Sequence, residues 1–228
     1  MNLISLVIVT SGRIDYLKSC LNSINLQNLK NFNIEIIVVN DDVNNKLQVK
    51  YFNKITKYDL KIFNNEEKKF MIKSRNIGAK FSKGKYILFI DDDNILDKDM
   101  ILNLYNFIEK KDDCAIIGPM MYDKNDILYL TYQKINLYTS KTRGFINHNK
   151  NKYFRTDGIP NCFMVECSYL KSINYFNEEL RQTFTEPDIT FAFRNKYNKE
   201  SYMISNAKVN HIVDIKNLSR KIGTNYNI

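Results

Sequence analysis

Two hydrophobic patterns alternate along the first half of the chain. Runs of consecutive apolar residues, typical of strands buried on both faces, predict strands at residues 3–9, 34–39, 60–63, 86–90 and 114–118. Between these runs, apolar residues recur every three or four positions, which predicts helices at residues 14–24, 70–81 and 100–108. Strands that alternate with helices through short connections predict an α/β fold, with a mostly parallel, Rossmann-like central sheet flanked by helices.

The pattern changes after residue 118. An antiparallel strand is predicted at residues 127–132, a helix at 189–194 and a closing strand at 202–212. Residues 141–157 are polar with few apolar anchors, so we predict a loop there that is mobile without ligand and closes over a bound one as a lid. We interpret residues 1–228 as one domain, with an α/β part at 1–118 and a smaller mixed part at 119–228.

Acidic residues gather where two of the predicted parallel strands end. Residues 40–42 (Asn-Asp-Asp) follow one strand, and residues 91–94 (Asp-Asp-Asp-Asn) follow another. Ligands of α/β sheets bind at the carboxyl ends of the strands. Successive carboxylates repel one another, and Mg²⁺ or Mn²⁺ with phosphate oxygens as further ligands relieves that repulsion. The alternative, an N-cap cluster leading into a helix at 95–105, explains one acidic residue but not three.

The amino-acid composition and the net charge limit which classes of binding partner we expect. The chain is 44% hydrophobic and 13% aromatic over 228 residues, as in globular proteins. Its formal net charge is +9, but the lysines are scattered without the interleaved aromatic and basic residues of nucleic-acid binders. This distribution favours a solvated basic surface and argues against a nucleic-acid partner. Contact with phosphorylated ligands, or peripheral contact with the inner face of a membrane, is compatible with the charge.

The cysteine pattern and the N-terminal run indicate a compartment. The 4 cysteines include no CxxC pair, which argues against a zinc site or a disulfide framework and favours reduced thiols in a cytoplasmic protein. The apolar run at residues 3–9 is too short for a signal sequence or a membrane-spanning helix. We therefore expect a cytoplasmic protein.

Several short motifs occur in a family-specific order. They are VTSGR at 9–13, VVNDDV at 38–43, SRNIG at 74–78 leading into GKYILFID at 84–91, the DxD-type DDD at 91–93, and PDITFAFR at 187–194. A DxD triplet alone is a weak signal, but the ordered set covers residues 3–212. On these motifs the chain resembles the inverting family 2 glycosyltransferases, which have the GT-A fold.

The resemblance implies a reaction and a cofactor. It implies transfer of a sugar from a nucleotide-sugar, in the first place a UDP-sugar, to a hydroxyl group of a glycan or lipid-linked acceptor, with Mn²⁺ or Mg²⁺ bound. It assigns the donor to residues 1–118, and the acceptor and catalysis to residues 119–228 of one GT-A domain. The implied donor-binding residues are Thr10, Arg13, Asp41, Arg75, Asp91 and Asp92.

Individual roles follow from the same resemblance. Thr10 and Asp41 are expected to flank the nucleobase, and Arg75 to approach the uridine or diphosphate. Asp93 is the expected metal ligand, with Asp91 near the ribose or the metal and with His211 completing the metal shell; an ordinary sheet histidine is the alternative for His211.

The expected general base is Asp188. The acidic residue that precedes the base in the family is replaced by Pro187, and Glu186 lies one step further back, so Glu186 is the alternative base. Apart from the family match, Asp188 also suits a helix cap.

Other functions fit the sequence less well. A sugar nucleotidyltransferase would carry a glycine-rich phosphate loop after the first strand, where Gly12 stands alone. A dinucleotide-dependent dehydrogenase would need GxGxxG at the same place, and that motif is missing. A relative that binds glycans or nucleotide-sugars without catalysis is a further alternative, against which Asp91, Asp93 and Asp188 argue.

Overall fold

The computed structural model describes residues 2–30, 32–139, 141–150, 152–159, 161–180 and 184–212. The elements follow in the order β1 (Asn2–Thr10), α1 (Ile14–Asn25), β2 (Phe32–Asn40), η1 (Val49–Tyr51), β3 (Leu60–Asn64), α2 (Phe70–Phe81), β4 (Tyr86–Asp91), β5 (Asn94–Leu96), α3 (Met100–Ile108), β6 (Cys114–Asp123), β7 (Leu128–Leu130), β8 (Tyr132–Asn136), β9 (Lys141–Phe145), β10 (Tyr153–Thr156), β11 (Cys162–Glu166), α4 (Cys167–Ser172), η2 (Glu178–Leu180), α5 (Thr185–Tyr197) and β12 (Glu200–His211).

A large mixed sheet runs through the described residues. Its order is β10-β12-β6-β11-β4-β1-β2-β3, with β5 paired to β12 and β7 to β6. Strands β4, β1, β2 and β3 are parallel, as their continuous apolar runs predict. Strand β11 inserts antiparallel between β4 and β6, so a strand from late in the chain lies in the middle of the sheet. The predicted α/β class with a mostly parallel central sheet is confirmed.

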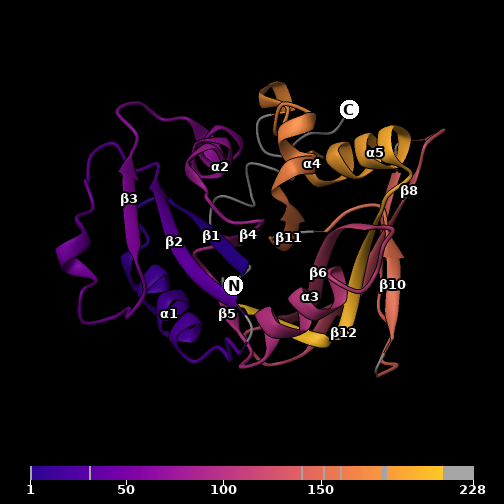
Figure 1. Cartoon of the computed structure of the whole chain (residues 1–228), viewed down its shortest axis with the longest axis horizontal. Coiled ribbons are helices and arrows are strands. Elements are labelled where there is room, and N and C mark those ends of the chain that lie inside the picture. Colours follow the sequence, from indigo (N-terminus) through magenta and orange to yellow (C-terminus); the bar gives the residue numbers. More distant parts are fainter. Residues whose placement is uncertain are drawn as a thin grey trace.

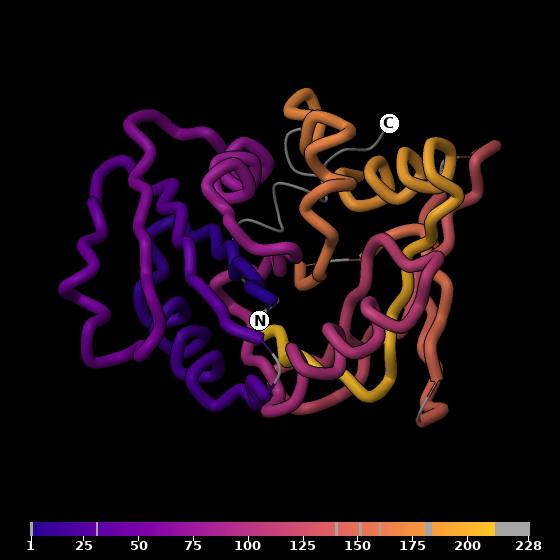
Figure 2. The backbone as a smooth tube through the Cα atoms, viewed as in Figure 1, coloured from indigo at the N-terminus to yellow at the C-terminus, as the bar shows by residue number. Residues whose placement is uncertain are grey.

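Helices cover both faces of this sheet. Helices α1 and α3 lie on one side, and α2, α4 and α5 lie on the other (Figure 1). The backbone tube shows the indigo and magenta first part of the chain around β1 to β3, and the orange and yellow later part towards the β10 edge (Figure 2). None of the helices in the described part of the chain combines the length and hydrophobicity needed to cross a membrane.

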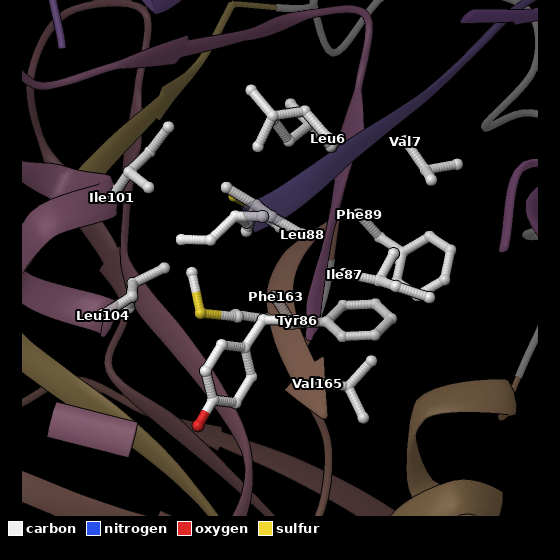
Figure 3. Close-up of a cluster of buried hydrophobic side chains, with 14 of the residues drawn as sticks. Leu6, Val7, Tyr86, Ile87, Leu88, Phe89, Ile101, Leu104, Phe163 and Val165 are labelled. Carbon is white, nitrogen blue, oxygen red and sulfur yellow. The ribbon is translucent and has the colours of Figure 1, made fainter. Parts of the chain in front are cut away.

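The central strands pack apolar side chains on both faces. Leu88 points towards Ile101 and Leu104 of α3, whereas Val7 and Phe89 point to the opposite side (Figure 3). All five side chains are at most 1% exposed. Full burial of such side chains stabilises the fold by roughly 1.5–3 kcal/mol each. The sheet is therefore held rigidly, and its strand ends form a fixed platform for a site.

The prediction of a loop at residues 141–157 is wrong. Residues 141–145 form β9 on β8, and residues 153–156 form β10 on β12. The apolar anchors that the segment lacks come from its neighbours, because Tyr132 stacks on Phe145 at 4.8 Å and on Phe154 at 5.4 Å between ring centroids. The composition of a segment does not show which residues from other segments it packs against. A lid formed by residues 141–157 would have to move strands that are paired with β8 and β12.

Two smaller expectations also differ from the structure. Residues 94–96, the start of the alternative helix at 95–105, form strand β5, and helix α3 begins only at Met100. The single strand expected at 127–132 is two strands, β7 and β8, which pair with different neighbours. In both cases the pairing partner, which is distant in sequence, determines the local conformation.

Candidate active site

A cavity opens at the carboxyl ends of the parallel strands. The register places Thr10 of β1 opposite Asn40 of β2, and Val9 opposite Asp91 of β4. The cavity has a volume of about 390 Å³ and is lined by Val9, Thr10, Ser11, Arg13, Asp41, Lys68, Phe70, Met71 and Asp91. Four of the donor-binding residues expected from the sequence thus line this cavity: Thr10, Arg13, Asp41 and Asp91. This is the position at which open α/β sheets bind their ligands.

Asp41 is held in place by the start of helix α2. Its Oδ1 accepts hydrogen bonds from Asn65 Nδ2 at 2.7 Å and from the Lys69 backbone N–H at 2.8 Å. Its Oδ2 accepts one from the Phe70 N–H at 2.9 Å. Two of these three donors are backbone N–H groups at the start of α2, so the helix start fixes the orientation of the carboxylate. Since Asp41 also lines the cavity, it is a fixed hydrogen-bond acceptor there.

Phe70 is a cavity residue that the sequence analysis missed. It is 44% exposed, and its φ of 60° lies in the left-handed region, which a bulky side chain adopts only under strain. The strain is sustained because the Phe70 N–H is bound to Asp41, which sets the ring at the mouth of the cavity. Its only sequence signal is an aromatic residue at a helix start, and that signal is unspecific. Lys68 and Met71 were missed as well, because a lysine and a methionine beside a helix start are equally unspecific signals.

Asp92 faces Thr10 and Arg13. Its Oδ2 accepts a hydrogen bond from Thr10 Oγ1 at 2.6 Å and one from Arg13 Nε at 3.3 Å, and its Oδ1 forms an ion pair with Arg13 Nη2. Burial raises the pKa of Asp92 to about 6, and Arg13 and Thr10 only partly offset this. Asp92 is fully buried, so it orients Thr10 and Arg13 and does not itself line the cavity.

Asp93 and His211 meet at the same edge of the sheet. Strand β5 pairs with the end of β12, with Asn94 opposite His211, and the Ile212 N–H donates to the Asp93 carbonyl at 2.9 Å. This pairing brings His211 Nε2 to 3.2 Å from Asp93 Oδ1. Burial raises the pKa of Asp93, but the contacts with His211 and Arg13 outweigh it and lower the pKa overall. The carboxylate is therefore ionised.

The Asp93–His211 pair suits a divalent cation. Asp93 Oδ1 is buried and accepts no hydrogen bond within the described residues, although His211 Nε2 is close. Two neighbouring ligands of an octahedral ion with bonds of about 2.1 Å lie about 3 Å apart, close to this separation. No group of three or more His, Cys, Asp or Glu side chains in the described ranges is arranged to hold an ion, so substrate oxygens would supply the other ligands.

Arg75 is placed differently from the sequence expectation. It is 2% exposed and does not line the cavity. Its Nη2 lies 3.0 Å from Asp91 Oδ1, and its Nη1 lies 2.6 Å from Glu186 Oε1. Burial raises the pKa of Asp91, with Arg75 opposing and Asp93 adding to the rise. Arg75 thus joins strand β4 to helix α5, and the cations left facing the cavity are Arg13 and Lys68.

The two candidate bases have different surroundings. Glu186 binds Arg75 and accepts a hydrogen bond from Thr185 Oγ1 at 2.9 Å. Asp188 is exposed and lines a second cavity, of about 440 Å³, together with Asn76. Partial burial raises the pKa of Asp188. The structure therefore connects Glu186, through Arg75, to Asp91 at the end of β4, and it places Asp188 outside the cavity at the strand ends.

Comparisons of the sequence with known proteins identify a family. Residues 5–174 match the model of Glycosyl transferase family 2. Glycosyltransferase GlyG of Streptococcus pneumoniae is 31% identical over 126 residues, covering 54% of this chain and 41% of GlyG. Poly(ribitol-phosphate) beta-N-acetylglucosaminyltransferase TarP of Staphylococcus aureus is 28% identical over 121 residues, covering 52% of this chain and 36% of TarP. The chain thus spans less than half the length of these relatives.

Solved structures show the same fold. GalNAc-T7 with UDP, GalNAc and Mn²⁺ superposes with a TM-score of 0.74 at 16% identity, covering 95% of this chain and 44% of that one. TarS 1–349 of S. aureus in complex with UDP superposes with a TM-score of 0.68 at 21% identity, covering 94% of this chain and 61% of that one. The family match and these folds lead to one conclusion: the chain belongs to glycosyl transferase family 2 and has the GT-A fold.

Proposed function

We propose that the chain is an inverting transferase that moves a sugar from a UDP-sugar onto a hydroxyl acceptor, with Mn²⁺ or Mg²⁺ bound. The observation that carries this proposal is the cavity at the strand ends, which Thr10, Asp41 and Arg13 line, and from which Arg13 reaches Asp93, the partner of His211, at 2.8 Å. The presence of UDP in the structures of TarS and GalNAc-T7, and of Mn²⁺ in that of GalNAc-T7, supports the choice of donor and cation.

The proposed donor site uses the groups already on the cavity wall. Asp41 accepts a hydrogen bond from the uracil edge, and Phe70 stacks on the base. Arg13 and Lys68 face the diphosphate. Asp93 and His211 hold the cation, which, when bound, stabilises the negative charge that grows on the departing diphosphate. Residues 1–118 thus serve the donor, and residues 119–228 serve the acceptor and catalysis.

The proposed reaction is a single displacement at the anomeric carbon. The acceptor oxygen forms a bond to that carbon as the bond to the diphosphate oxygen breaks, and the configuration inverts. A carboxylate in the first turn of α5 takes the hydroxyl proton. The position of Glu186, which Arg75 links to Asp91 on the cavity wall, supports Glu186 for this role, and the family resemblance supports Asp188.

The acceptor proposed is a glycan or a saccharide on a phosphate-bearing carrier, at the cytoplasmic face of a membrane. The name of TarP, which refers to poly(ribitol-phosphate), supports an anionic acceptor.

A direct experiment tests the reaction. UDP, GDP and CMP are compared for thermal stabilisation with Mn²⁺ or Mg²⁺, and a panel of UDP-sugars is then screened for metal-dependent release of UDP. Stabilisation by UDP alone, together with UDP release, supports the proposal. Stabilisation by GDP or CMP and not by UDP would overturn the choice of donor.

A further inference from the structure

A long segment of the chain carries only positive charge. Residues 127–156 include Lys134, Lys141, Arg143, Lys150, Lys152 and Arg155, and they include no Asp or Glu. The antiparallel hairpin of β8 and β9 forms the middle of this segment. We call its Lys134, Lys141 and Arg143 side chains the cationic face.

The strand register places these three cations together. Lys134 lies directly opposite Arg143, and Asn136 lies opposite Lys141, so all four side chains share one face of the hairpin. Like charges directly opposite each other destabilise a strand pair. The nearest carboxylate oxygen to Lys134 is Asp157 Oδ1 at 3.8 Å, and it already binds Arg194 at 3.0 Å. In the described part of the chain, neither Lys141 nor Arg143 makes an ion pair, so this repulsion has little compensation within the fold.

The same hairpin encloses a hollow. A cavity of about 730 Å³ is lined by Lys134, Ile135, Asn136, Thr139, Lys141, Thr142, Arg143 and Phe145. The rings of Phe145, Tyr132 and Phe154 form a stack at the inner end of the hairpin, with interplanar angles of 8° and 6°. Hydroxyl, amide and cationic groups beside flat aromatic faces suit a ligand with phosphates and with sugar or polyol units.

The hairpin is tied to the helix that carries the candidate bases. The Ile135 N–H donates to Asp157 Oδ2 at 3.0 Å, and Arg194 of α5 donates to Asp157 Oδ1 at 3.0 Å. A Cβ added to Gly158 would lie 2.7 Å from Gln133 Oε1 and 3.2 Å from Pro187 Cγ, which shows how closely β8 and the start of α5 approach (Figure 1). The hairpin that carries the cationic face therefore lies next to the first turn of α5, although the Gln133 contact is made from the face of β8 opposite to Lys134.

We propose that the cationic face binds the phosphate groups of an acceptor chain that carries phosphodiester links, and so guides a hydroxyl of that chain towards α5. The inference rests on the proposed transferase function, and it specifies the acceptor class and its site. An anionic bilayer is the competing ligand, because Leu137 and Tyr138 at the hairpin turn are 71% and 100% exposed. The hollow with polar walls and the aromatic stack favour a chain laid into the hairpin over a flat membrane.

The test uses two variants of equal charge. In the first, Lys134, Lys141 and Arg143 are all changed to Gln. In the control, the exposed Lys46, Lys50 and Lys54 near η1 are changed to Gln, which lowers the net charge equally. The probe is a fluorescent synthetic glycerol-phosphate oligomer followed by anisotropy at several salt concentrations, and vesicles of phosphatidylglycerol and phosphatidylcholine are tested in parallel by flotation.

We expect the hairpin variant to bind the oligomer about tenfold more weakly, and the control to bind as the wild type does. Stabilisation by UDP and release of UDP without acceptor should be the same in all three proteins, which separates this inference from the proposed reaction. Equal weakening in both variants would overturn the proposal in favour of net charge alone. Loss of vesicle binding with unchanged oligomer binding would overturn it in favour of a membrane. If UDP stabilises no protein, the proposed donor fails, whatever the oligomer shows.

Discussion

His211 Nε2 lies 3.2 Å from Asp93 Oδ1, although Asp93 belongs to the part at residues 1–118 and His211 to the end of the part at residues 119–228. The contact arises from the pairing of β5 with the end of β12, and it leaves a buried carboxylate oxygen to which no described residue donates a hydrogen bond. A cation bound here would satisfy that oxygen, so the pair connects the fold to the proposed chemistry.

Loss of Asp93 should remove the effect of the cation on UDP binding, and loss of His211 should weaken that effect. With wild-type protein and UDP at a hundredfold its dissociation constant, we expect a stabilisation of about 2.7 kcal/mol. Asp93→Asn should abolish the part that depends on Mn²⁺ and should abolish turnover, whereas His211→Ala should weaken both less. Thermal unfolding in the presence of UDP, with and without Mn²⁺, measures the part of the stabilisation that depends on the cation. Asp15→Asn is the control, because Asp15 is 97% exposed on α1. Metal-dependent stabilisation that persists in Asp93→Asn would refute the assignment.

The base is tested by two substitutions that keep shape and remove basicity. Because Arg75 links Glu186 to Asp91 on the cavity wall, we expect that Glu186→Gln lowers turnover by roughly 10²–10⁴, the usual contribution of general base catalysis, while UDP binding is retained. Asp188→Asn should then lower turnover by a smaller factor. The reverse ranking would identify Asp188 as the base, in line with the family motif. Normal turnover in both variants would argue against a single protein base, and the anomeric configuration of the product would then need to be determined.

Arg75 is expected to contribute to stability as well as to the site. Arg75→Met leaves the carboxylates of Asp91 and Glu186 without their shared partner, and breaking a buried ion pair in this way costs about 3 kcal/mol or more. Arg155→Met is the matched control, since the 51% exposed side chain of Arg155 pairs with Glu200 near the surface and its loss should cost at most about 1 kcal/mol. Urea unfolding compares the two. Similarly small losses in the free energy of unfolding would show that the Arg75 ion pairs stabilise the fold no more than a surface ion pair does.

Phe70 should contribute to nucleotide affinity. Stacking of a base on an aromatic side chain is worth about 1–3 kcal/mol by alanine substitution. Phe70→Ala should therefore weaken UDP binding by roughly tenfold or more, which calorimetry can measure. Tyr51→Ala, at a 48% exposed aromatic residue of η1, should leave UDP binding unchanged. An unchanged dissociation constant in Phe70→Ala would remove Phe70 from the proposed donor site.

A buried carboxylate away from the site makes stability depend on pH. Burial raises the pKa of Glu35, but hydrogen bonds from Lys61 Nζ, Ser5 Oγ and the Lys83 N–H outweigh burial and lower the pKa from its ordinary value of 4.5. A lowered folded-state pKa gives stability that is present above the unfolded pKa and is lost as pH falls through the folded one.

Glu35→Gln should accordingly destabilise the protein by about 1–3 kcal/mol at neutral pH. The difference from wild type should shrink as the pH falls below about 4.5. Urea unfolding over a pH series measures both effects. A difference that stays constant across the series would mean that the charge of Glu35 is not the cause.

The sequence by itself determined the α/β class and the sheet edge at which the candidate site lies. Continuous apolar runs at β1, β2 and β4 report burial on both faces, and this requires a covered parallel sheet. In such a sheet the residues that directly follow the strands reach a common edge, so residues 40–42 and 91–93 could be placed together from their spacing alone. The same reasoning located Asp41, which directly follows a strand, whereas Thr10 was expected only from the family resemblance.

Only the tertiary structure decided how the charged groups are paired. The burial of Arg75 between Asp91 and Glu186 and the hairpin within the expected loop depend on strand order and packing between distant segments. The approach of His211 to Asp93 was expected from the family resemblance, but not from the local pattern of residues. Local patterns of hydrophobic and polar residues carry no record of such partners. A guanidinium in a helical motif has the same sequence signature whether it faces a phosphate or a carboxylate, and the fold determines which group comes within reach.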